Sequence, residues 1–315
     1  MAKYIAGRLA AMLPVLAVVA VTVFLLIHLI PGDPASVMLG PDASVVQVNQ
    51  LRHELGLDRP LWVQFVLWLG RLLQGDLGES IFLRRKVAQA IWEHLGPTVS
   101  LTALAEALAL LVALPSGVLA AWKRDSRFDQ AFMSIALLGV SIPSFWTGLN
   151  LIALFAVTIR LFPVAGYVPP SHGVGPWVGS LLLPAVALAF TQAGLIARMA
   201  RDSTIDVLDE DYIRTARSKG QGEIRVLVHH AFRNALIPTL TVIGTGLAAL
   251  LGGAVVVETV FVLPGIGNLV VQSISRRDYP VVEGVVLLVA LGYVVINLLV
   301  DLLYAAIDPR IRYEA

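Results

Sequence analysis

Long apolar segments alternate with shorter polar segments along most of this chain. Six of the apolar segments reach the roughly 20 residues that an α-helix needs to cross a bilayer. They cover about residues 9–30, 98–121, 130–158, 180–199, 236–260 and 283–305. The pattern therefore predicts an all-α, polytopic membrane protein with six transmembrane helices. It divides the chain into a first transmembrane helix (1–30), a long connecting segment (31–96) and a five-helix core (97–315).

The composition agrees with this pattern, because 57% of the 315 residues are hydrophobic and only 14% are charged. A soluble domain of this length is rarely so apolar. Of the 23 Arg and Lys residues, 13 lie in four segments, 1–8, 122–129, 200–235 and 306–315, and six lie in the long segment 31–96, whose length makes them count weakly in the positive-inside rule. The positive-inside rule therefore predicts that these segments and both termini face the cytosol and that 31–96 is extracytoplasmic. No small-residue cleavage site follows the first apolar segment, so we interpret it as an uncleaved span.

The extracytoplasmic segment is too long to be a simple connector, so we expect it to fold. Amphipathic spacing predicts two helices, over 45–55 and 61–73, because Gly56 to Pro60 supplies a helix stop followed by a new start. Three aromatic residues of the second helix favour a position at the membrane interface, in contact with lipid: Trp62, Phe65 and Trp68.

The most polar part of the core lies between the fourth and fifth predicted spans, over 209–238. Asp209 is placed to cap a first short helix, and Gly220 is placed to end it in a left-handed backbone conformation. Gly222 to Phe232 predicts a second short helix. Both helices mix apolar residues with Arg and Lys, which suits a surface that binds a soluble partner. The alternative is an ordinary basic cytosolic loop.

Polar or kink-forming residues within the predicted spans are candidates for lining a pathway across the membrane. They are Glu106, Ser141, Pro143, Asn150 and Glu258. Pro143 removes a backbone hydrogen bond and should kink the third helix. The alternative role for these residues is helix packing, with Glu106 protonated or hydrogen-bonded to another helix. A relay of Glu106, Glu258 and Asp301 would instead fit a proton-coupled carrier.

Several kinds of chemistry have no motif in this sequence. There is no G-x-x-x-x-G-K-[ST] phosphate loop, no H-E-x-x-H zinc motif and no G-x-S-x-G nucleophile motif. Cysteine is absent, and the adjacent His229 and His230 should point away from each other on an α-helix. We therefore expect no bound cofactor, no metal and no catalysis by this chain. A net charge of +1 also argues against nucleic-acid binding.

The residue order of the polar loop is more specific than its charge. It reads YIRTARSKG over 212–220 and HAFRNALIP over 230–238. This order resembles the EAA loop of ABC importer permeases, in the variant of the dipeptide/oligopeptide branch. The general family has Glu-Ala-Ala before the glycine, whereas this chain has Arg214-Thr215-Ala216, a departure typical of the peptide branch. Further likeness at 31–34, 56–60, 75–80, 264–267, 276–280 and 308–313 extends the resemblance over nearly the whole chain.

The resemblance implies a type I ABC importer permease that moves di- or oligopeptides across the bacterial cytoplasmic (inner) membrane. Glutathione, nickel complexes or other small solutes are alternative cargoes. The implied partners are a second homologous permease subunit, an extracytoplasmic peptide-binding protein that docks on 31–96, and two cytosolic ATPases that hydrolyse ATP with Mg²⁺. The docking role of 31–96 and a purely structural cap remain open alternatives. Gly244, Gly246, Gly252 and Gly253 favour close helix contact, within the chain or with the second subunit.

In this family the loop is the coupling helix, which docks on the ATPases. The residues expected to couple this chain to the ATPases are Asp209, Tyr212, Arg214, Thr215, Ala216, Arg217, Lys219, Gly220, Arg225, His230, Arg233 and Asn234.

Overall fold

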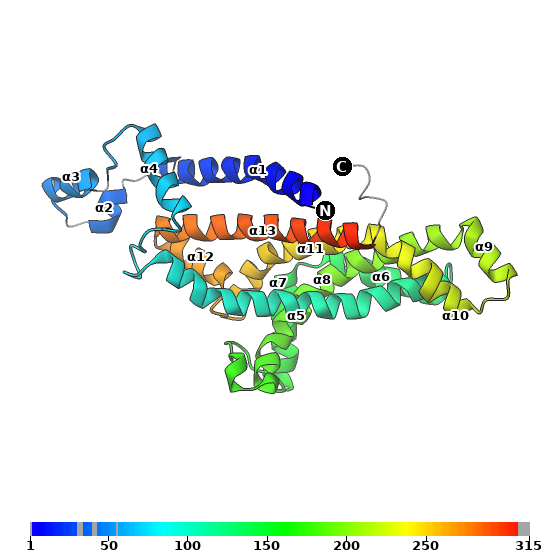
Figure 1. Cartoon of the computed structure of the whole chain (residues 1–315). Helices are drawn as coiled ribbons and strands as arrows, with labels where there is room; N and C mark the ends of the chain where they lie inside the picture. Colours follow the sequence, from blue (N-terminus) through cyan, green and yellow to red (C-terminus); the bar gives the residue numbers. More distant parts are fainter. Residues whose placement is uncertain (1, 30–33, 40–42, 55, 308–315) are drawn as a thin grey trace. The chain divides into compact units, whose positions relative to one another are not determined.

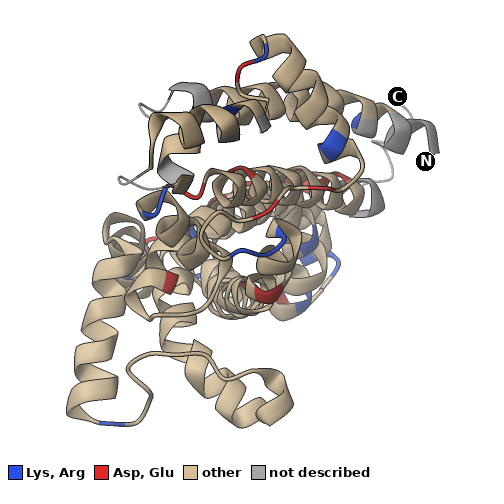
Figure 2. Cartoon of the chain, turned by 90° about the vertical axis from the view of Figure 1, so that its left-hand side faces the viewer, with Lys and Arg blue, Asp and Glu red and all other residues tan. Residues whose placement is uncertain are grey.

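The computed structural model describes residues 2–29, 34–39, 43–54 and 56–307 (Figure 1). These residues form helices joined by turns, and the only strand-like feature among them is an isolated bridge between Glu79 and Lys86. The all-α fold class is therefore confirmed. Charged residues are sparse along the ribbon, as expected for helices that face lipid or one another (Figure 2).

The chain separates into two compact units. Unit 1 contains Gly96–Asn268 together with the chain from Val295 onward, and unit 2 contains Ala2–Leu95 and Leu269–Val294. The divisions fall near the start of α5 (Val87–Trp122), within α12 (Ile266–Ser275) and within α13 (Tyr279–Ile307).

Unit 1 is built around α8 (Val174–Leu208), which is the most buried of the long helices. Its apolar core joins residues of α5, α8 and α11 (Arg233–Val260), including Leu101, Leu181, Leu188 and Leu250, with Phe261 at the C-cap of α11. The remaining elements of unit 1 in chain order are α6 (Arg127–Ser141), α7 (Ser144–Leu151), the π-helical η1 (Ile152–Thr158), the 3₁₀ turn η2 (Pro170–His172), α9 (Asp211–Ser218), α10 (Glu223–Arg225) and the π-helical η3 (Val226–Phe232).

Glycines allow α8 to approach its neighbours closely. A Cβ atom at Gly194 would lie 2.4 Å from the carbonyl oxygen of Ala136 in α6, and a Cβ at Gly117 in α5 would lie 2.6 Å from that of Ala197. Such small residues let helix backbones meet without intervening side chains. In α11, Gly244 faces Val300 and Gly246 faces Gln192, whereas the Cβ of a residue at 252 would meet open space.

The contacts of Gly194 and Gly117 were not anticipated from the sequence, which had drawn attention to α11 alone. For Gly244 and Gly246 the structure favours packing within the chain over contact with a second subunit. Gly253 also faces its own chain, since its Cβ would lie 3.4 Å from Leu188.

Unit 2 contains α1 (Ala2–Leu29), α2 (Pro34–Leu39), α3 (Val45–Glu54) and α4 (Leu61–Leu73). The two helices predicted in the segment 31–96 are thus confirmed as α3 and α4. Phe65 and Trp68 of α4 contact the ring of Phe24 of α1, Phe65 edge to face and Trp68 tilted, with ring centroids 5.2 and 5.7 Å from that of Phe24. Only Trp62 of the three aromatic residues remains mostly exposed, at 71%.

Among the described residues, four helical segments are long and apolar enough to cross a membrane: Val87–Trp122, Val174–Leu208, Glu223–Val260 and Tyr279–Leu303. The pair formed by α6 and α7 with η1 can supply a fifth span, although it bends by 102°. The first predicted span corresponds to α1, whose apolar described part, Ala10–Leu25, is a shorter helix. The six-span count therefore stays a prediction.

The proline of the third span breaks the helix instead of kinking it. Ile142 ends α6 in an extended conformation (φ −89°, ψ 124°), and Pro143 is extended as well (φ −61°, ψ 137°). A residue before proline disfavours the helical conformation, and two successive extended residues turn the chain. Pro184 and Pro238, by contrast, lie inside α8 and α11 without ending them.

Candidate functional site: the polar loop between α8 and α11

Gly220 terminates the first loop helix, α9, two residues after its last residue Ser218, as the sequence predicts. Gly220 has φ +78°, which is the left-handed conformation that only glycine adopts easily. Its N–H donates to the carbonyl of Arg217 (2.9 Å), and the N–H of Gln221 donates to that of Ala216 (3.3 Å). These two bonds form a Schellman motif, which satisfies carbonyl groups at the helix end. A Cβ at Gly220 would meet nothing within 4 Å.

The start of α9 differs from the prediction. Asp209 does not cap α9, because α8 continues beyond its predicted end and Asp209 occupies the C-cap of α8. Glu210 takes the N-cap position of α9 without a side-chain hydrogen bond. The Asp209 carboxylate instead pairs with Arg124, 3.3 Å away, in the segment between α5 and α6. The loop therefore contacts the segment 122–129, which is also predicted to be cytosolic.

The second loop helix runs directly into the fifth predicted span. α10, η3 and α11 form one continuous helical segment, Glu223–Val260, of 38 residues. The prediction of a separate short helix is wrong on this point, because Pro238 removes one backbone donor without stopping the helix. The π-helical part has more residues per turn, so adjacent side chains diverge less than in an α-helix. His229 and His230 accordingly lie edge to face with ring centroids 5.4 Å apart, contrary to our expectation.

The loop has a small apolar core of its own. Ile213, Ala216 and Val226 are buried together and pack against Val207 and Leu208 at the end of α8. This core holds α9 against η3, so the loop is a folded element and not an irregular connection.

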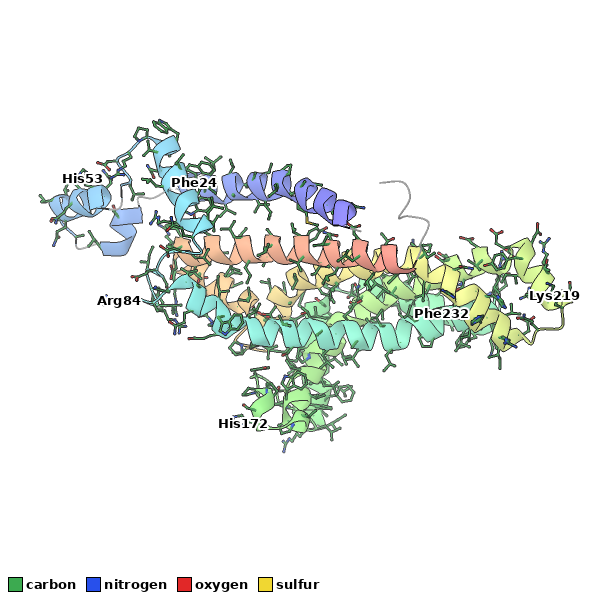
Figure 3. All side chains as sticks on the ribbon, viewed as in Figure 1. Phe24, His53, Arg84, His172, Lys219 and Phe232 are labelled. Carbon is green, nitrogen blue, oxygen red and sulfur yellow. The ribbon has the colours of Figure 1, made fainter. Side chains whose placement is uncertain are left out.

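Three polar contacts tie the two sides of the loop together. Arg217 Nε donates to Glu223 at 2.8 Å, His230 Nε2 lies 2.7 Å from Gln221 Oε1, and Asn234 Nδ2 donates to the Tyr212 hydroxyl at 2.7 Å. Figure 3 shows Lys219 at the tip of the loop and Phe232 where the loop joins α11.

Most of the predicted coupling residues lie on the loop surface. His230 is half-buried, Ala216 belongs to the buried core, and the other ten are exposed: Asp209, Tyr212, Arg214, Thr215, Arg217, Lys219, Gly220, Arg225, Arg233 and Asn234. Exposed apolar side chains lie among them, with Ile224 at 76% and Val228 at 58%. Within the described part of the chain, Lys219, Arg225 and Arg233 have no carboxylate at ion-pair distance. The surface thus offers unpaired cations beside apolar side chains.

A buried ion pair near the loop was not found by sequence reasoning. Arg201 of α8 binds Asp129 of α6 through both carboxylate oxygens, with Nε to Oδ1 at 2.6 Å and Nη2 to Oδ2 at 2.7 Å. The Asp129 side chain is only 3% exposed and also accepts the backbone N–H of Asp125 at 3.0 Å. The pattern Ser126-x-x-Asp129, in which the Ser126 hydroxyl caps α6, is the one local signal of this site.

Among the intramembrane candidates, Glu258 is completely buried. Its Oε1 accepts the Thr98 hydroxyl at 2.5 Å, and its Oε2 accepts the backbone N–H of Asn268 at 3.1 Å. A Cβ at Gly265 would lie 2.3 Å from this carboxyl group. The geometry therefore makes Glu258 the acceptor that closes the turn after α11, and it does not place Glu258 on a surface that could line a pathway.

Glu106 is also buried, at 7% exposed, and within the described residues neither of its oxygens has a hydrogen-bond partner. The other three candidates are exposed around the break between α6 and α7. Ser141 donates its hydroxyl to the carbonyl of Leu137, and Asn150 donates its amide to that of Trp146, each at 2.8 Å. Pro143 forms the break itself. Their role in a pathway stays a prediction.

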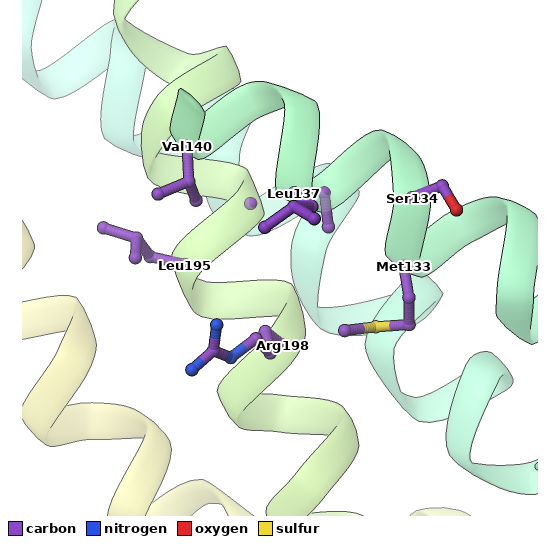
Figure 4. A pocket seen from close by; sticks show the side chains of 8 residues that line it. Met133, Ser134, Leu137, Val140, Leu195 and Arg198 are labelled. Carbon is purple, nitrogen blue, oxygen red and sulfur yellow. The ribbon is translucent and has the colours of Figure 1, made fainter. Parts of the chain in front are cut away.

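A groove of about 380 Å³ lies between α6 and α8 (Figure 4). Its lining is mainly apolar, with Met133, Leu137, Val140 and Leu195, and Arg198 is its one charged member. None of these residues is among the functional candidates predicted from the sequence. Nothing in the described part of the chain gathers three or more metal-binding side chains in this groove or elsewhere.

The sequence matches two families of transport-system components. Residues 113–313 match the family described as "Binding-protein-dependent transport system inner membrane component", and residues 1–102 match the corresponding N-terminal family.

Relatives match over the full length. A protein of Brucella abortus (strain 2308), provisionally named a peptide transport system permease protein, is 50% identical over 100% of both chains. The dipeptide transport system permease protein DppB of Alkalihalophilus pseudofirmus is 41% identical over 99% of this chain and 100% of its own. The glutathione transport system permease protein GsiC of Salmonella choleraesuis is 43% identical over 100% of both.

Solved structures share the fold at low identity. A chain of the MetNI methionine ABC transporter in an inward-facing conformation has a TM-score of 0.59 and 18% identity, and the match covers 70% of this chain and 97% of that chain.

Proposed function

Since this chain belongs to the family of inner-membrane components of binding-protein-dependent transport systems, we propose that, as an ABC importer permease, it imports di- and oligopeptides. Full-length relatives named for peptide and dipeptide transport support this cargo. Glutathione is itself a small peptide, so the glutathione permeases are consistent with the same chemical class. Small solutes such as nickel complexes are the alternative cargo.

The single observation that carries the coupling mechanism is the continuity of the loop with the membrane helices. α10, η3 and α11 form one helical segment, and α9 packs on η3 through Ile213, Ala216 and Val226. A displacement of the loop would therefore move α11 directly, with no flexible joint in between. Partner ATPases would bind the exposed face around Lys219, Arg225 and Ile224 and drive this displacement when they close on ATP.

The chain itself would do no chemistry in this mechanism. ATP and Mg²⁺ would be bound by two cytosolic ATPase subunits, because this sequence lacks a phosphate loop. A second homologous permease subunit would complete the pore, and a binding protein would deliver the peptide to the extracytoplasmic side. In this arrangement the loop and both termini face the cytosol, and the segment 31–96 faces outward.

Reconstitution in proteoliposomes tests the proposal. The chain, its partner permease, the ATPases and the binding protein should together accumulate a labelled dipeptide only when ATP is present on the cytosolic side. Uptake by the chain alone, driven by a proton gradient without ATP, would establish the carrier alternative instead. Competition by unlabelled glutathione and by a nickel complex, each compared with unlabelled dipeptide, decides among the cargoes.

A further inference from the structure

A buried carboxylate in unit 2 joins two segments that lie far apart in the sequence. Asp278 is 1% exposed and accepts hydrogen bonds from the Ser80 hydroxyl and from the backbone N–H groups of Ile81 (3.1 Å) and Phe82 (3.2 Å). The Ser80 hydroxyl oxygen in turn accepts the N–H of Leu83 at 2.8 Å. Because a carboxylate accepts several donors at once, this arrangement fixes the backbone of 80–83 against the start of α13.

The junction brings three exposed arginines into one neighbourhood. Arg276 and Arg277 immediately precede Asp278, and Arg84 follows the segment that Asp278 binds. The Arg276 guanidinium lies 3.7 Å from the centroid of the Phe82 ring, a cation–π contact that orients it. Figure 3 shows Arg84 at the edge of unit 2.

Unlike the neighbouring Arg85, these three arginines have no carboxylate within ion-pair distance among the described residues. Arg85 pairs with Glu93 at 2.7 Å, and its charge is thereby offset. Asp76 and Glu79 are the other exposed acids of this segment, and neither forms an ion pair with the three arginines. Asp278 directs its oxygens to the donors of 80–82. Three guanidinium groups therefore remain available to a partner.

Two of the three arginines have unusual backbone conformations. Arg84 has φ +50° and Arg277 has φ +56°, in the left-handed region that residues with a Cβ rarely adopt. Strain of this kind is concentrated at functional sites. Arg160 and Val262 also have a positive φ (61° and 52°), so this conformation alone does not select a charged function, and the inference rests on the unpaired guanidinium groups.

We propose that Arg84, Arg276 and Arg277 form a docking surface for an acidic face of the soluble binding protein that delivers substrate. This inference rests on the proposed function and on the extracytoplasmic placement of the segment. A fixed guanidinium recognises a carboxylate through two parallel hydrogen bonds, and preorganisation by Asp278 and Phe82 lowers the entropic cost of binding. Attraction to anionic lipid headgroups needs only mobile cations near the surface, so the rigid junction favours a protein partner.

The test uses the complete transporter in nanodiscs and, as the probe, the binding protein that supports uptake by the unmodified transporter. Failure of that uptake would overturn the proposed function before the docking surface is tested. Where uptake is established, the association rate is measured for the double variant Arg84→Asn/Arg277→Asn, since asparagine tolerates the left-handed conformation. The matched control is Arg160→Asn, an exposed arginine of unit 1 that also has a positive φ (61°).

We expect the double variant to associate about tenfold more slowly at about 0.01 M salt, with a smaller deficit at about 0.15 M, where charges are screened over a shorter distance. Arg160→Asn should associate at the unmodified rate. The lysine variant Arg84→Lys/Arg277→Lys keeps the charge and should retain most of the rate, which separates loss of charge from loss of folding. Unmodified association by the asparagine variant would overturn the proposal. The same deficit in Arg160→Asn would also overturn it. So would a double variant that copurifies with less anionic phospholipid but associates with the binding protein at the unmodified rate.

Discussion

Replacing Gly220 by valine tests whether the loop couples the permease to its ATPases. At φ +78° a valine side chain is strained, yet its Cβ would meet no atom within 4 Å. The perturbation is therefore purely conformational and does not create a steric clash. Gly222→Val supplies a matched control, because Gly222 also has open space around its Cβ and has an ordinary extended conformation (φ −66°, ψ 145°).

The magnitude follows from two competing costs. A residue with a Cβ in the left-handed conformation is destabilised by roughly 1–2 kcal/mol. Escaping that strain means losing the two Schellman hydrogen bonds of Gly220 and Gln221, each worth about 0.5–1.5 kcal/mol. The two costs are similar, so the native turn and a displaced turn would coexist, and the docking-competent fraction would fall by about twofold to tenfold. The membrane helices would be unaffected, because none of these bonds involves them.

The assay measures three quantities on purified complexes: ATPase subunits bound per permease, ATP hydrolysis and dipeptide uptake in proteoliposomes. We expect Gly220→Val to insert and purify normally but to bind fewer ATPases or to hydrolyse ATP without matching uptake. Gly220→Asn should lie close to the unmodified protein, since asparagine tolerates the left-handed conformation. Normal uptake by Gly220→Val, or an equal loss in Gly222→Val, would refute this reasoning and leave the loop as a basic connection only.

Three further predictions address stability and orientation. Asp129→Asn should lower the thermal unfolding temperature of the purified complex, because a broken buried ion pair costs about 3 kcal/mol or more and leaves Arg201 without its partner; an unchanged temperature would contradict this. Gly265→Ala should destabilise the turn after α11, measured by faster limited proteolysis, since its Cβ would lie 2.3 Å from the Glu258 carboxyl group; Gly252→Ala, which meets open space, is the control. A single cysteine replacing the exposed Ser218 should react with an impermeant reagent only from the cytosolic side, and labelling from outside would reverse the predicted orientation.

Local signals in the sequence account for the features that were predicted correctly. The apolar segments indicated helices because a helix in lipid must be both long and apolar. Gly220 was placed in the left-handed region because a glycine after a polar helix is a common end of that helix. The helices α3 and α4 followed from amphipathic spacing and from the stop at Gly56 to Pro60. Each of these inferences uses residues that are neighbours in the sequence.

Contacts between distant residues account for what was missed. Arg201 and Asp129 are 72 positions apart, and Ser80 and Asp278 are 198 positions apart. No spacing rule connects such residues, since packing of the helices decides which side chains meet. Packing between distant segments also explains why the predicted N-cap of α9, Asp209, was wrong. Asp209 is a suitable cap for α9 by local rules, but the continuation of α8 places it at the end of the preceding helix.

The carrier alternative requires Glu106, Glu258 and Asp301 to pass protons to one another, and the geometry of Glu258 opposes this. Glu258 contacts α5 at Thr98, which precedes Glu106 by eight positions, or about 12 Å along a helix. Its oxygens are held by a hydroxyl and a backbone N–H at the turn that follows α11. A proton released from Glu258 toward a pathway would require this turn to open in every transport cycle. Opening would break the hydrogen bonds of Glu258 to Thr98 and Asn268, and unmade hydrogen bonds are costly in a buried site. The proposed mechanism, driven from the loop between α8 and α11, would move α11 as one helix and keep this turn closed, so it would not require these hydrogen bonds to break.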